Sequence, residues 1–537
     1  MTTNFSRFFL PALAGLAACA SRGPSPASPG AAPAPVPPVV MRAPVPPANL
    51  ALPPVPLVTG PLAIRVVYPL ADHLVQSRDS NFVFGSVGNG EAGLTVNGVL
   101  TPVWPNGAFM AWVANPTPDA ARYDIVATTG TDTVRLVLPV RIAPTPPTVP
   151  VAPPADSTVP PPVARYATLL GSALYPSDTD RVVTGYAPTG GIQRWFLFPG
   201  TIVKVTETRG ADAFVQLDSS QTIRIVTGDL DTLAASYRPV PRRARAFRLV
   251  PAASWTDVVI PISEKPAYVV RQSDSSLTLT VYGTTGPRTT PVTVKPAGDA
   301  YVTSVTASPI GQQLQYTIAL RGPVFGYQPL FENGDFVFRV RRPPAIDSIA
   351  PLRGLTITVD PGHPPIGATG PTGLWEPEAT LPVGLRLQTL LQEKGASVVM
   401  TRTAPEPVAL NDRPALARRA DSHALVSIHL NAVPDGVNPL RVEGTATYHY
   451  HPHSRALAEA TQRGLVQELA LRDNGVKREN FAVVRLTWMP SVLAEGAFII
   501  VPEQEAALRT PEYQERYAKG LVTGLENYFR TLAGIRP

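Results

Sequence analysis

Proline is the feature that most restricts how this chain can fold. The sequence of 537 residues contains 63 prolines, and they are densest in two stretches, 20–62 and 144–163. Proline fixes φ and lacks an amide donor, so such stretches favour extended polyproline conformation over a packed core. We therefore predict two linkers. Because a single compact domain rarely exceeds about 250–300 residues, we expect several domains between and after them.

The N-terminus has the charge and hydrophobicity of an export signal. Arg7 supplies a positive charge, and residues 8–18 form an apolar run that is shorter than the roughly 20 residues needed to span a membrane. The end of segment 1–19 resembles a bacterial lipobox, with Cys19 at its last position. This resemblance implies lipid attachment to Cys19 and a periplasm-facing lipoprotein of the outer membrane, bound to the membrane by its lipid anchor only. An ordinary secretory signal is the alternative, and both predict export.

Charge and cysteine content exclude further classes. The net charge is +6, and the only dense basic run is the short segment 241–245. Nucleic-acid binding would require a basic stripe or a known module, so we expect no nucleic-acid partner. Cys19 is the single cysteine of the sequence, so no disulfide is expected within the chain.

Residues 63–143 are predicted to form a β-sandwich. Runs of β-forming residues, such as 134–140, are separated by turn signals that contain glycine and asparagine. The spacing of these runs suits a small sandwich. Segments 94–98 and 105–109 resemble bacterial immunoglobulin-like modules.

Two more all-β modules are predicted after the second linker. Residues 164–240 contain short β-forming runs, and the turn at 198–201 resembles the start of small bacterial SH3-like barrels. Residues 241–343 continue with runs such as 276–282. No catalytic cluster stands out before residue 350.

The pattern changes in residues 350–534, where strands alternate with helices. Residues 355–359 and 424–428 are predicted strands, and the apolar residues between 383 and 391 follow the spacing of one helical face. This alternation indicates an α/β domain with a mostly parallel central sheet flanked by helices. The predicted fold class is therefore multidomain, with N-terminal all-β modules followed by a C-terminal α/β domain.

Candidate functional residues of this domain lie near the ends of its predicted strands. His363 and His429 each follow a strand, and Glu495 lies in a third apolar segment. In open α/β sheets, ligands bind beyond the carboxyl ends of the strands, where residues from distant parts of the chain meet. Glu376 begins a predicted helix and is followed by proline, which is typical of the first helical position. This placement would bring Glu376 near His363.

Two histidines and one carboxylate form a known catalytic zinc set that leaves a fourth position for water. Zinc lowers the pKa of water towards about 7 and polarises a carbonyl oxygen, and both effects help to hydrolyse an amide. A carboxylate that is not a ligand must then move the proton from water to the departing nitrogen, and Glu495 is the candidate. The sequence offers no catalytic cysteine and no nucleophile-elbow serine.

Six motifs occur in order across residues 355–529 and resemble the zinc-dependent N-acetylmuramoyl-L-alanine amidases of the Amidase_3 type. The motifs are Val359–His363, Gly367–Glu376, Thr401–Arg402, Leu410–Arg413, Ser427–Ala432 and Pro490–Phe498. The resemblance implies one Zn²⁺ ion held by His363, Glu376 and His429, with Glu495 as the catalytic glutamate. It also implies that the substrate is peptidoglycan and that the bond cleaved joins N-acetylmuramic acid to L-alanine.

Several residues near these motifs have alternative interpretations. Asn431 either orients His429 or lines the substrate groove, and Arg413 either orients the site or is structural. Glu378 lies on the same first helical turn and is the alternative to Glu376 as ligand. Arg402 is interpreted as structural.

The sequence departs from the family pattern at the first histidine and after the glutamate, where Pro377 and Glu378 replace the usual lysine and aspartate. The family usually has two glycines after the first histidine, and Pro364 and Pro365 stand there instead. Three alternating histidines, His449, His451 and His453, suggest a second metal site, although exposed histidines at a strand end are the preferred interpretation.

Three functional hypotheses follow from the sequence. The first is an amidase that acts in cell-wall remodelling or daughter-cell separation, with a protein activator as a possible partner. The module at 241–343 resembles the all-β targeting module that often precedes cell-wall amidases, so the β modules are expected to dock the enzyme on the wall. The second is a non-catalytic wall-binding or regulatory lipoprotein, and the third is a zinc peptidase that cuts within the stem peptide.

Overall fold

The computed structural model describes residues 41–45, 49, 51–130, 132–144, 165–171 and 182–535. The predicted signal segment with Cys19 lies outside the described residues, as do most of the second linker and part of the first. Within the part of the chain that is described, no helix combines the length and the apolar character needed to cross a bilayer.

The first β region is a sandwich of antiparallel sheets. A three-stranded sheet has the order β1-β3-β6, a four-stranded sheet has the order β5-β4-β7-β8, and β2 and β9 form a short parallel pair. Buried residues of both larger sheets share one apolar core. The strands are β1 (Arg65–Tyr68), β2 (Leu74–Val75), β3 (Ser80–Ser86), β4 (Gly93–Val96), β5 (Val99–Thr101), β6 (Ala108–Ala114), β7 (Arg122–Thr129), β8 (Asp132–Pro139) and β9 (Arg141–Ile142).

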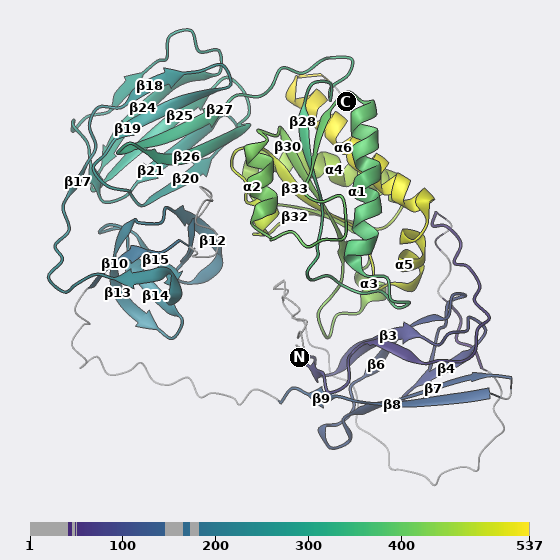
Figure 1. Cartoon of the computed structure of the whole chain (residues 1–537). Helices are drawn as coiled ribbons and strands as arrows, with labels where there is room; N and C mark the ends of the chain where they lie inside the picture. The colour runs from purple at the N-terminus through teal and green to yellow at the C-terminus, as the bar shows by residue number, and fades with distance from the viewer. Residues whose placement is uncertain are drawn as a thin grey trace, which may run out of the picture.

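The three-stranded sheet of this sandwich buries both of its faces. In β3, Val83 packs into the sandwich core, whereas Phe82 and Phe84 join the apolar cluster of the C-terminal domain. In β6, Ala111 likewise packs into the sandwich core, and Met110 joins the cluster of the C-terminal domain. Successive side chains of a strand point to opposite faces, so this sheet is a layer between two cores. Figure 1 shows it next to α3 and α5 of the C-terminal domain.

The end of the first proline-rich stretch packs on both of these domains. Leu52 is buried in the cluster that the sandwich shares with the C-terminal domain. The amide of Val58 donates to the carbonyl oxygen of Pro105 at 2.9 Å, and Arg516 donates to the carbonyl oxygen of Ala51. Residues 51–62 therefore contact folded structure along their length.

The second β region contains three larger sheets around one continuous apolar cluster. A seven-stranded sheet has the order β12-β11-β15-β14-β13-β10-β16, a four-stranded sheet β18-β19-β27-β26 and a five-stranded sheet β20-β21-β25-β24-β23. Trp195, Ile260 and Leu279 come from different sheets and belong to the same cluster. The two predicted modules at 164–240 and 241–343 thus share a core.

The strands of the seven-stranded sheet are β10 (Arg165–Leu169), β11 (Val183–Ala187), β12 (Gly190–Leu197), β13 (Ile202–Arg209), β14 (Asp212–Gln216), β15 (Thr222–Val226) and β16 (Leu230–Thr232). The remaining strands of this region are β17 (Arg242–Arg243), β18 (Arg248–Pro251), β19 (Trp255–Pro261), β20 (Tyr268–Gln272), β21 (Ser276–Val281), β22 (Thr284–Thr285), β23 (Val292–Val294), β24 (Val302–Ile310), β25 (Gln313–Leu320), β26 (Gly326–Glu332) and β27 (Asp335–Arg341).

The C-terminal domain is built on a six-stranded sheet with the order β29-β28-β30-β33-β31-β32. All neighbouring strands are parallel except β31 and β33, which are antiparallel. The strands are β28 (Thr356–Pro361), β29 (Ser397–Met400), β30 (Ala424–Asn431), β31 (Thr445–His449), β32 (Asp473–Arg478) and β33 (Ser491–Phe498). The helices are α1 (Glu376–Glu393), α2 (Asp412–Arg419), α3 (Pro439–Val442), α4 (Arg455–Leu469), α5 (Pro502–Leu508) and α6 (Pro511–Leu532).

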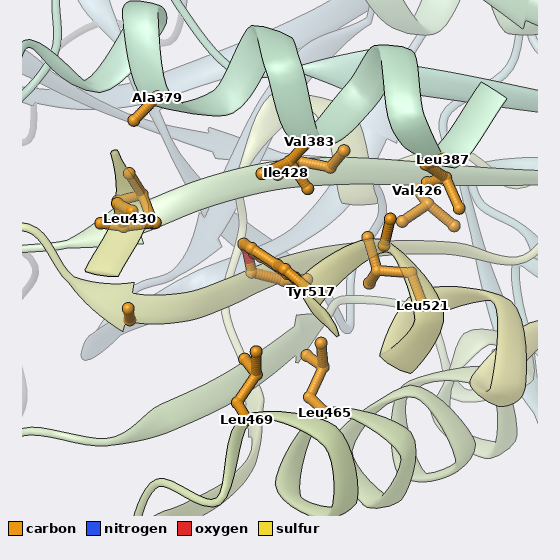
Figure 2. Packing of buried hydrophobic residues seen from close by; sticks show 14 of the residues in the cluster. Ala379, Val383, Leu387, Val426, Ile428, Leu430, Leu465, Leu469, Tyr517 and Leu521 are labelled. Carbon is orange, nitrogen blue, oxygen red and sulfur yellow. The ribbon is translucent and has the colours of Figure 1, made fainter. Parts of the chain in front are cut away.

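The helices α1, α4 and α6 cover one face of this sheet, and α2 lies on the other (Figure 1). Val383 and Leu387 of α1 are completely buried against Ile428 of β30, and Figure 2 shows their side chains directed into a core that Leu465 of α4 and Leu521 of α6 also enter. The predicted apolar helical face is thereby confirmed. The mostly parallel α/β domain behind all-β regions is confirmed as well.

The second β region lies on the α2 side of the C-terminal domain (Figure 1). Arg341 of β27 joins the two: it is 2% exposed and donates to the carbonyl oxygens of Ser422 at 2.7 Å and Asp421 at 2.8 Å. Its guanidinium also stacks 4.7 Å from the ring of Trp488. Trp255 and Phe196 of the β region pack against a group of buried apolar residues of the C-terminal domain that includes Trp488.

Candidate metal centre

His363 lies at the carboxyl end of β28, two residues beyond the strand. Its backbone has φ of 60°, which is uncommon for a residue with a side chain and occurs often at functional sites. Gly362 precedes it, and a Cβ there would lie 2.5 Å from the His429 ring. Only glycine therefore allows the His363 loop to pass so close to His429.

Glu376 is the first residue of α1 and is 3% exposed. Its Oε2 accepts a hydrogen bond from the amide of Ala368 at 3.0 Å, and its Oε1 accepts one from the amide of Leu430, also at 3.0 Å. Two main-chain donors, one from the segment before α1 and one from strand β30, thus fix the carboxylate. Glu378 instead is exposed and bonds back to the amide of Trp375 at 3.3 Å, which caps the helix and directs it away from the histidines.

His363, Glu376 and His429 come together as a compact group. His363 Nε2 lies 3.2 Å from Glu376 Oε2, and His429 Nδ1 lies 3.1 Å from Glu376 Oε1. The two imidazole rings are perpendicular, with centroids 4.8 Å apart. The potential ligand atoms of all three lie within 4.8 Å of one another, and no other such group occurs among the described residues. A histidine–histidine–carboxylate set of this size fits a zinc ion.

Neighbouring groups determine the pKa values of this cluster. Burial acts to raise the pKa of Glu376, but the two histidines outweigh it and the pKa lies below its usual value. Burial is also the main reason that the pKa of His429 is lowered. The imidazole of His429 is therefore favoured in the neutral form, which is the form that binds metals.

Glu495 lies in β33 directly opposite His429 of β30. Its Oε2 is buried and has no hydrogen-bond partner among the described residues. Burial first, and the negative charge of Glu376 second, raise the pKa of Glu495 well above its usual value. The next residue, Gly496, donates its amide to the hydroxyl of Tyr517 at 2.9 Å. Tyr517, which the sequence did not suggest, thus fixes the strand beside Glu495.

Two buried arginines hold the loop that carries His363. Arg413 donates to the carbonyl oxygens of His363 at 3.0 Å and Pro364 at 3.1 Å. Arg402 donates to the carbonyl oxygens of Gly362 at 3.1 Å and Pro377 at 2.8 Å, so it joins this loop to the first turn of α1. Both side chains thus support the main chain around His363, and the contact of Arg413 with the Pro364 carbonyl places this proline in a well-bonded loop.

Two buried acids near the site were missed from the sequence. Asp360 is fully buried and accepts hydrogen bonds from Thr401 and Ser427, each at 2.6 Å, in addition to Arg413. Glu505 of α5 is also fully buried and accepts from the amide of Leu374 at 3.0 Å, so it fixes the segment before Glu376. Asp360 belongs to the first motif, and an acid inside a buried strand was the available signal for it.

Asn431 is the last residue of β30. The predicted strand stopped at residue 428, whereas β30 continues through Asn431. His429 is therefore part of strand β30 and does not follow it. Glu495 is likewise part of a strand, β33. Both are held by the sheet itself.

The three alternating histidines do not gather around one point. His449, His451 and His453 are 6–7% exposed, so the expectation of exposed side chains is wrong. The His451 and His453 rings stack with centroids 5.5 Å apart. His453 Nδ1 lies 3.1 Å from Gln272 Oε1 of the second β region. The cover that this region provides explains the burial, and no second group suited to a metal occurs among the described residues.

The known proteins that resemble this chain match it in the C-terminal domain. The family described as Amidase_3, N-acetylmuramoyl-L-alanine amidase, matches residues 357–527. The uncharacterised protein YqiI of Bacillus subtilis is 35% identical over 192 residues, which cover 35% of this chain and 90% of YqiI. The amidase LytC of the same organism is 36% identical over 186 residues, or 34% of this chain and 36% of LytC.

Two more proteins match the same part of the chain. The probable cell wall amidase LytH of Staphylococcus aureus is 33% identical over 183 residues, which cover 33% of this chain and 60% of LytH. The solved structure of the amidase AmiC2 of Nostoc punctiforme is 31% identical, with 35% of this chain and 99% of that chain covered and a TM-score of 0.31. The match thus spans well under two thirds of LytC and of LytH, but nearly all of YqiI. Through residues 357–527, the chain belongs to the Amidase_3 family of N-acetylmuramoyl-L-alanine amidases.

Proposed function

We propose that this chain is exported and hydrolyses the amide between N-acetylmuramic acid and L-alanine in peptidoglycan. The observation that carries the proposal is the grouping of His363, Glu376 and His429, whose potential ligand atoms lie within 4.8 Å of one another in a domain of this family. Glu495 lies on the neighbouring strand, opposite His429.

The three residues are proposed to hold one zinc ion. The two histidine nitrogens approach different oxygens of the same buried carboxylate, at 3.2 and 3.1 Å, so all three side chains face a shared point. A zinc ion bound there would polarise the amide carbonyl and lower the pKa of water. Its positive charge would also favour the ionised form of the nearby carboxyl of Glu495.

Glu495 is proposed to be the general base and then the general acid. As base, its carboxylate removes a proton from the water that attacks the carbonyl carbon. As acid, it delivers that proton to the nitrogen when the carbon–nitrogen bond breaks. The products are a carboxylate on the glycan side and an L-alanine amino terminus on the stem peptide. Asn431, two residues from His429 on the same strand, is proposed to contact the substrate.

The test uses the full-length protein on purified peptidoglycan, with zinc or with a chelator, and mass spectrometry of the products. Release of intact stem peptides that begin with L-alanine, only when zinc is present, is the expected result. Shortened peptides on intact glycan would instead identify a peptidase, and absence of release with zinc bound stoichiometrically would overturn the proposal.

A matched pair of variants tests the role of Glu495. Glu495→Gln keeps the size of the side chain but removes the base, so the rate should fall by about 10²–10⁴-fold while bound zinc stays at one equivalent. Glu512→Gln removes the same charge from an exposed position on α6 and should leave both readouts unchanged. Equal activity of Glu495→Gln and the parent protein would exclude Glu495 as the base.

The location and biological role are proposed from the sequence. Cys19 carries the lipid of an outer-membrane lipoprotein, and the β regions dock the enzyme on the wall during remodelling or cell separation, with or without a protein activator. Replacement of Cys19 by serine should abolish incorporation of labelled fatty acid and move the protein from the membrane fraction to the soluble fraction. Continued labelling of the variant would refute the anchor.

A further inference from the structure

A cavity of about 780 Å³ lies between the second β region and the C-terminal domain. Trp195, Tyr268 and Tyr327 line it from the β region, and Tyr450 and Trp488 line it from the C-terminal domain. Ligand sites of proteins typically measure about 300–1,000 Å³ and are often found between domains. None of the residues of the histidine–glutamate group contributes to the lining, so this cavity is distinct from the metal centre.

The charged side chains that line the cavity are all positive. Among the described residues that form the lining there are four arginines but no aspartate or glutamate, and the arginines come from both sides of the cavity. They are Arg194 of β12, Arg271 of β20, Arg478 of β32 and Arg485. Within the described part of the chain, none of the four forms an ion pair with a carboxylate. Four positive charges around one hollow, with no acid among the described lining residues, favour an anionic ligand.

Arg485 is partly buried in the wall, whereas Arg194, Arg271 and Arg478 are exposed. Arg478 donates to the carbonyl oxygen of Tyr450 at 3.0 Å, and its guanidinium lies 5.0 Å from the Tyr450 ring, so the side chain is held in place. The Nε of Arg485 is buried without a hydrogen-bond partner among the described residues. Arg194 and Arg271 are exposed and approach the cavity from neighbouring strands of the β region.

The rest of the lining matches a peptide better than a simple inorganic anion. Three glutamines and an asparagine reach the cavity, and each carries both a donor and an acceptor. They are Gln221, Gln272, Gln328 and Asn411. Paired donors and acceptors suit the amide groups of a peptide, whereas phosphate would require donors only. The aromatic rings provide apolar surface for aliphatic side chains.

We propose that this cavity binds a short peptide that bears free carboxylates, the chemistry of the peptidoglycan stem. The inference rests on the proposed function for the choice of ligand, and it adds a second wall-binding site beside the catalytic one. Guanidinium groups recognise carboxylates through paired hydrogen bonds, and the four arginines provide this recognition from two domains. A bound stem peptide would therefore bridge the β region and the C-terminal domain.

The first test measures binding without catalysis, by isothermal titration of the full-length protein with the peptide L-Ala-γ-D-Glu-L-Lys-D-Ala-D-Ala. This peptide lacks the bond that the enzyme is proposed to cut. The same peptide with its carboxyl groups converted to amides is the control ligand, and we expect it to bind at least tenfold more weakly. Equal affinities of the two peptides would overturn the proposal.

The second test locates the site with two double variants of equal charge. Arg194→Gln with Arg271→Gln removes the two arginines that the second β region contributes to the cavity, and the affinity should fall roughly tenfold for each arginine. Arg243→Gln with Arg245→Gln removes two arginines that do not line the cavity and should bind like the parent. Thermal unfolding of each variant verifies that it is folded.

The outcomes separate this inference from the proposed function. If the cavity variant binds the peptide as tightly as the parent, the site is wrong, whatever the amidase assay shows. If the protein releases stem peptides from peptidoglycan but does not bind the free peptide, only the cavity proposal fails. If the free peptide binds and depends on the two arginines while no amidase activity is found, the cavity proposal stands and the proposed function fails.

Discussion

Arg413 and Asp360 form a buried ion pair, with 2.7 Å between Nη1 and Oδ1, at the carboxyl end of β28. The side chains are 3% and 0% exposed. The second terminal nitrogen of Arg413 continues to the carbonyl oxygen of His363. One pair of charges thereby connects the interior of the sheet to the loop of the metal centre, so its integrity bears on both stability and metal binding.

Replacement of Arg413 by glutamine should destabilise the protein strongly. The change leaves the carboxylate of Asp360 buried without its charged partner, which typically costs about 3–5 kcal/mol. For a domain of this size, the calorimetric midpoint of the C-terminal domain should fall by roughly 10 °C. Arg353→Gln breaks an ion pair whose arginine is 64% exposed, and the shift should be about 2 °C or less. Similar shifts for the two variants would contradict the assigned importance of the buried pair.

The same ion pair predicts a loss of stability in acid. Burial alone would raise the pKa of Asp360, but Arg413 and the two hydroxyl donors outweigh it and the pKa lies below its usual value. An aspartate with a lowered folded pKa contributes its full stabilisation above the unfolded pKa of about 3.9 and loses it as the pH falls towards the folded value. Calorimetry between pH 6 and pH 3 should therefore show a steeper decline for the parent than for Asp360→Asn. Parallel curves would exclude this contribution.

Gly362→Ala should disrupt metal binding more than folding. A Cβ at this position would lie 2.5 Å from the His429 ring, so the ring or the His363 loop must move. Displacement of a ligand should lower the affinity for zinc by at least the 10–100-fold that is typical of changes beside a metal site. Competition with a chelator measures this affinity. Gly228→Ala places its Cβ in open space and should bind zinc normally. Unchanged zinc affinity in Gly362→Ala would show that the site tolerates a wider spacing.

Asp435→Ala should loosen the sandwich from the C-terminal domain. Asp435 follows β30 and accepts hydrogen bonds from the amide of Gln76 at 2.7 Å and from Asn81 Nδ2 at 3.0 Å. A hydrogen bond to a charged group contributes about 1.5–3 kcal/mol, so amide hydrogen exchange in β3 should accelerate by roughly 10–100-fold. Asp119→Ala at an exposed position of the same sandwich is the control. Identical exchange in both variants would mean that apolar packing alone holds the interface.

Local patterns in the sequence predicted much of the C-terminal domain. The spacing of Val383, Leu387 and Leu391 identified the buried face of α1, and all three are fully buried. The start of α1 at Glu376 also agrees with the prediction. The placement of His363, Glu376 and His429 in one group was anticipated because parallel strands end at the same edge of a sheet.

Contacts between domains were beyond the reach of such patterns. Phe82, Val83 and Phe84 are consecutive apolar residues, and a period of two does not tell which face meets another domain. The polarity of His451 and His453 suggested exposure, but the second β region covers them and Gln272 provides a hydrogen bond to His453. The pairing of Asp360 with Arg413 spans 53 positions of the sequence, so no local signal reveals it.

The sheet β1-β3-β6, buried on both faces, makes the catalytic domain of this chain depend on a neighbouring domain to cover its apolar surface. A domain excised at residue 350 would present to water the apolar surface that Phe82 and Met110 cover, and a second patch around Trp488 that Trp255 covers. Exposed patches of this kind promote self-association. In this chain, the sandwich and the second β region therefore serve as covers that keep two apolar surfaces of the catalytic domain out of water.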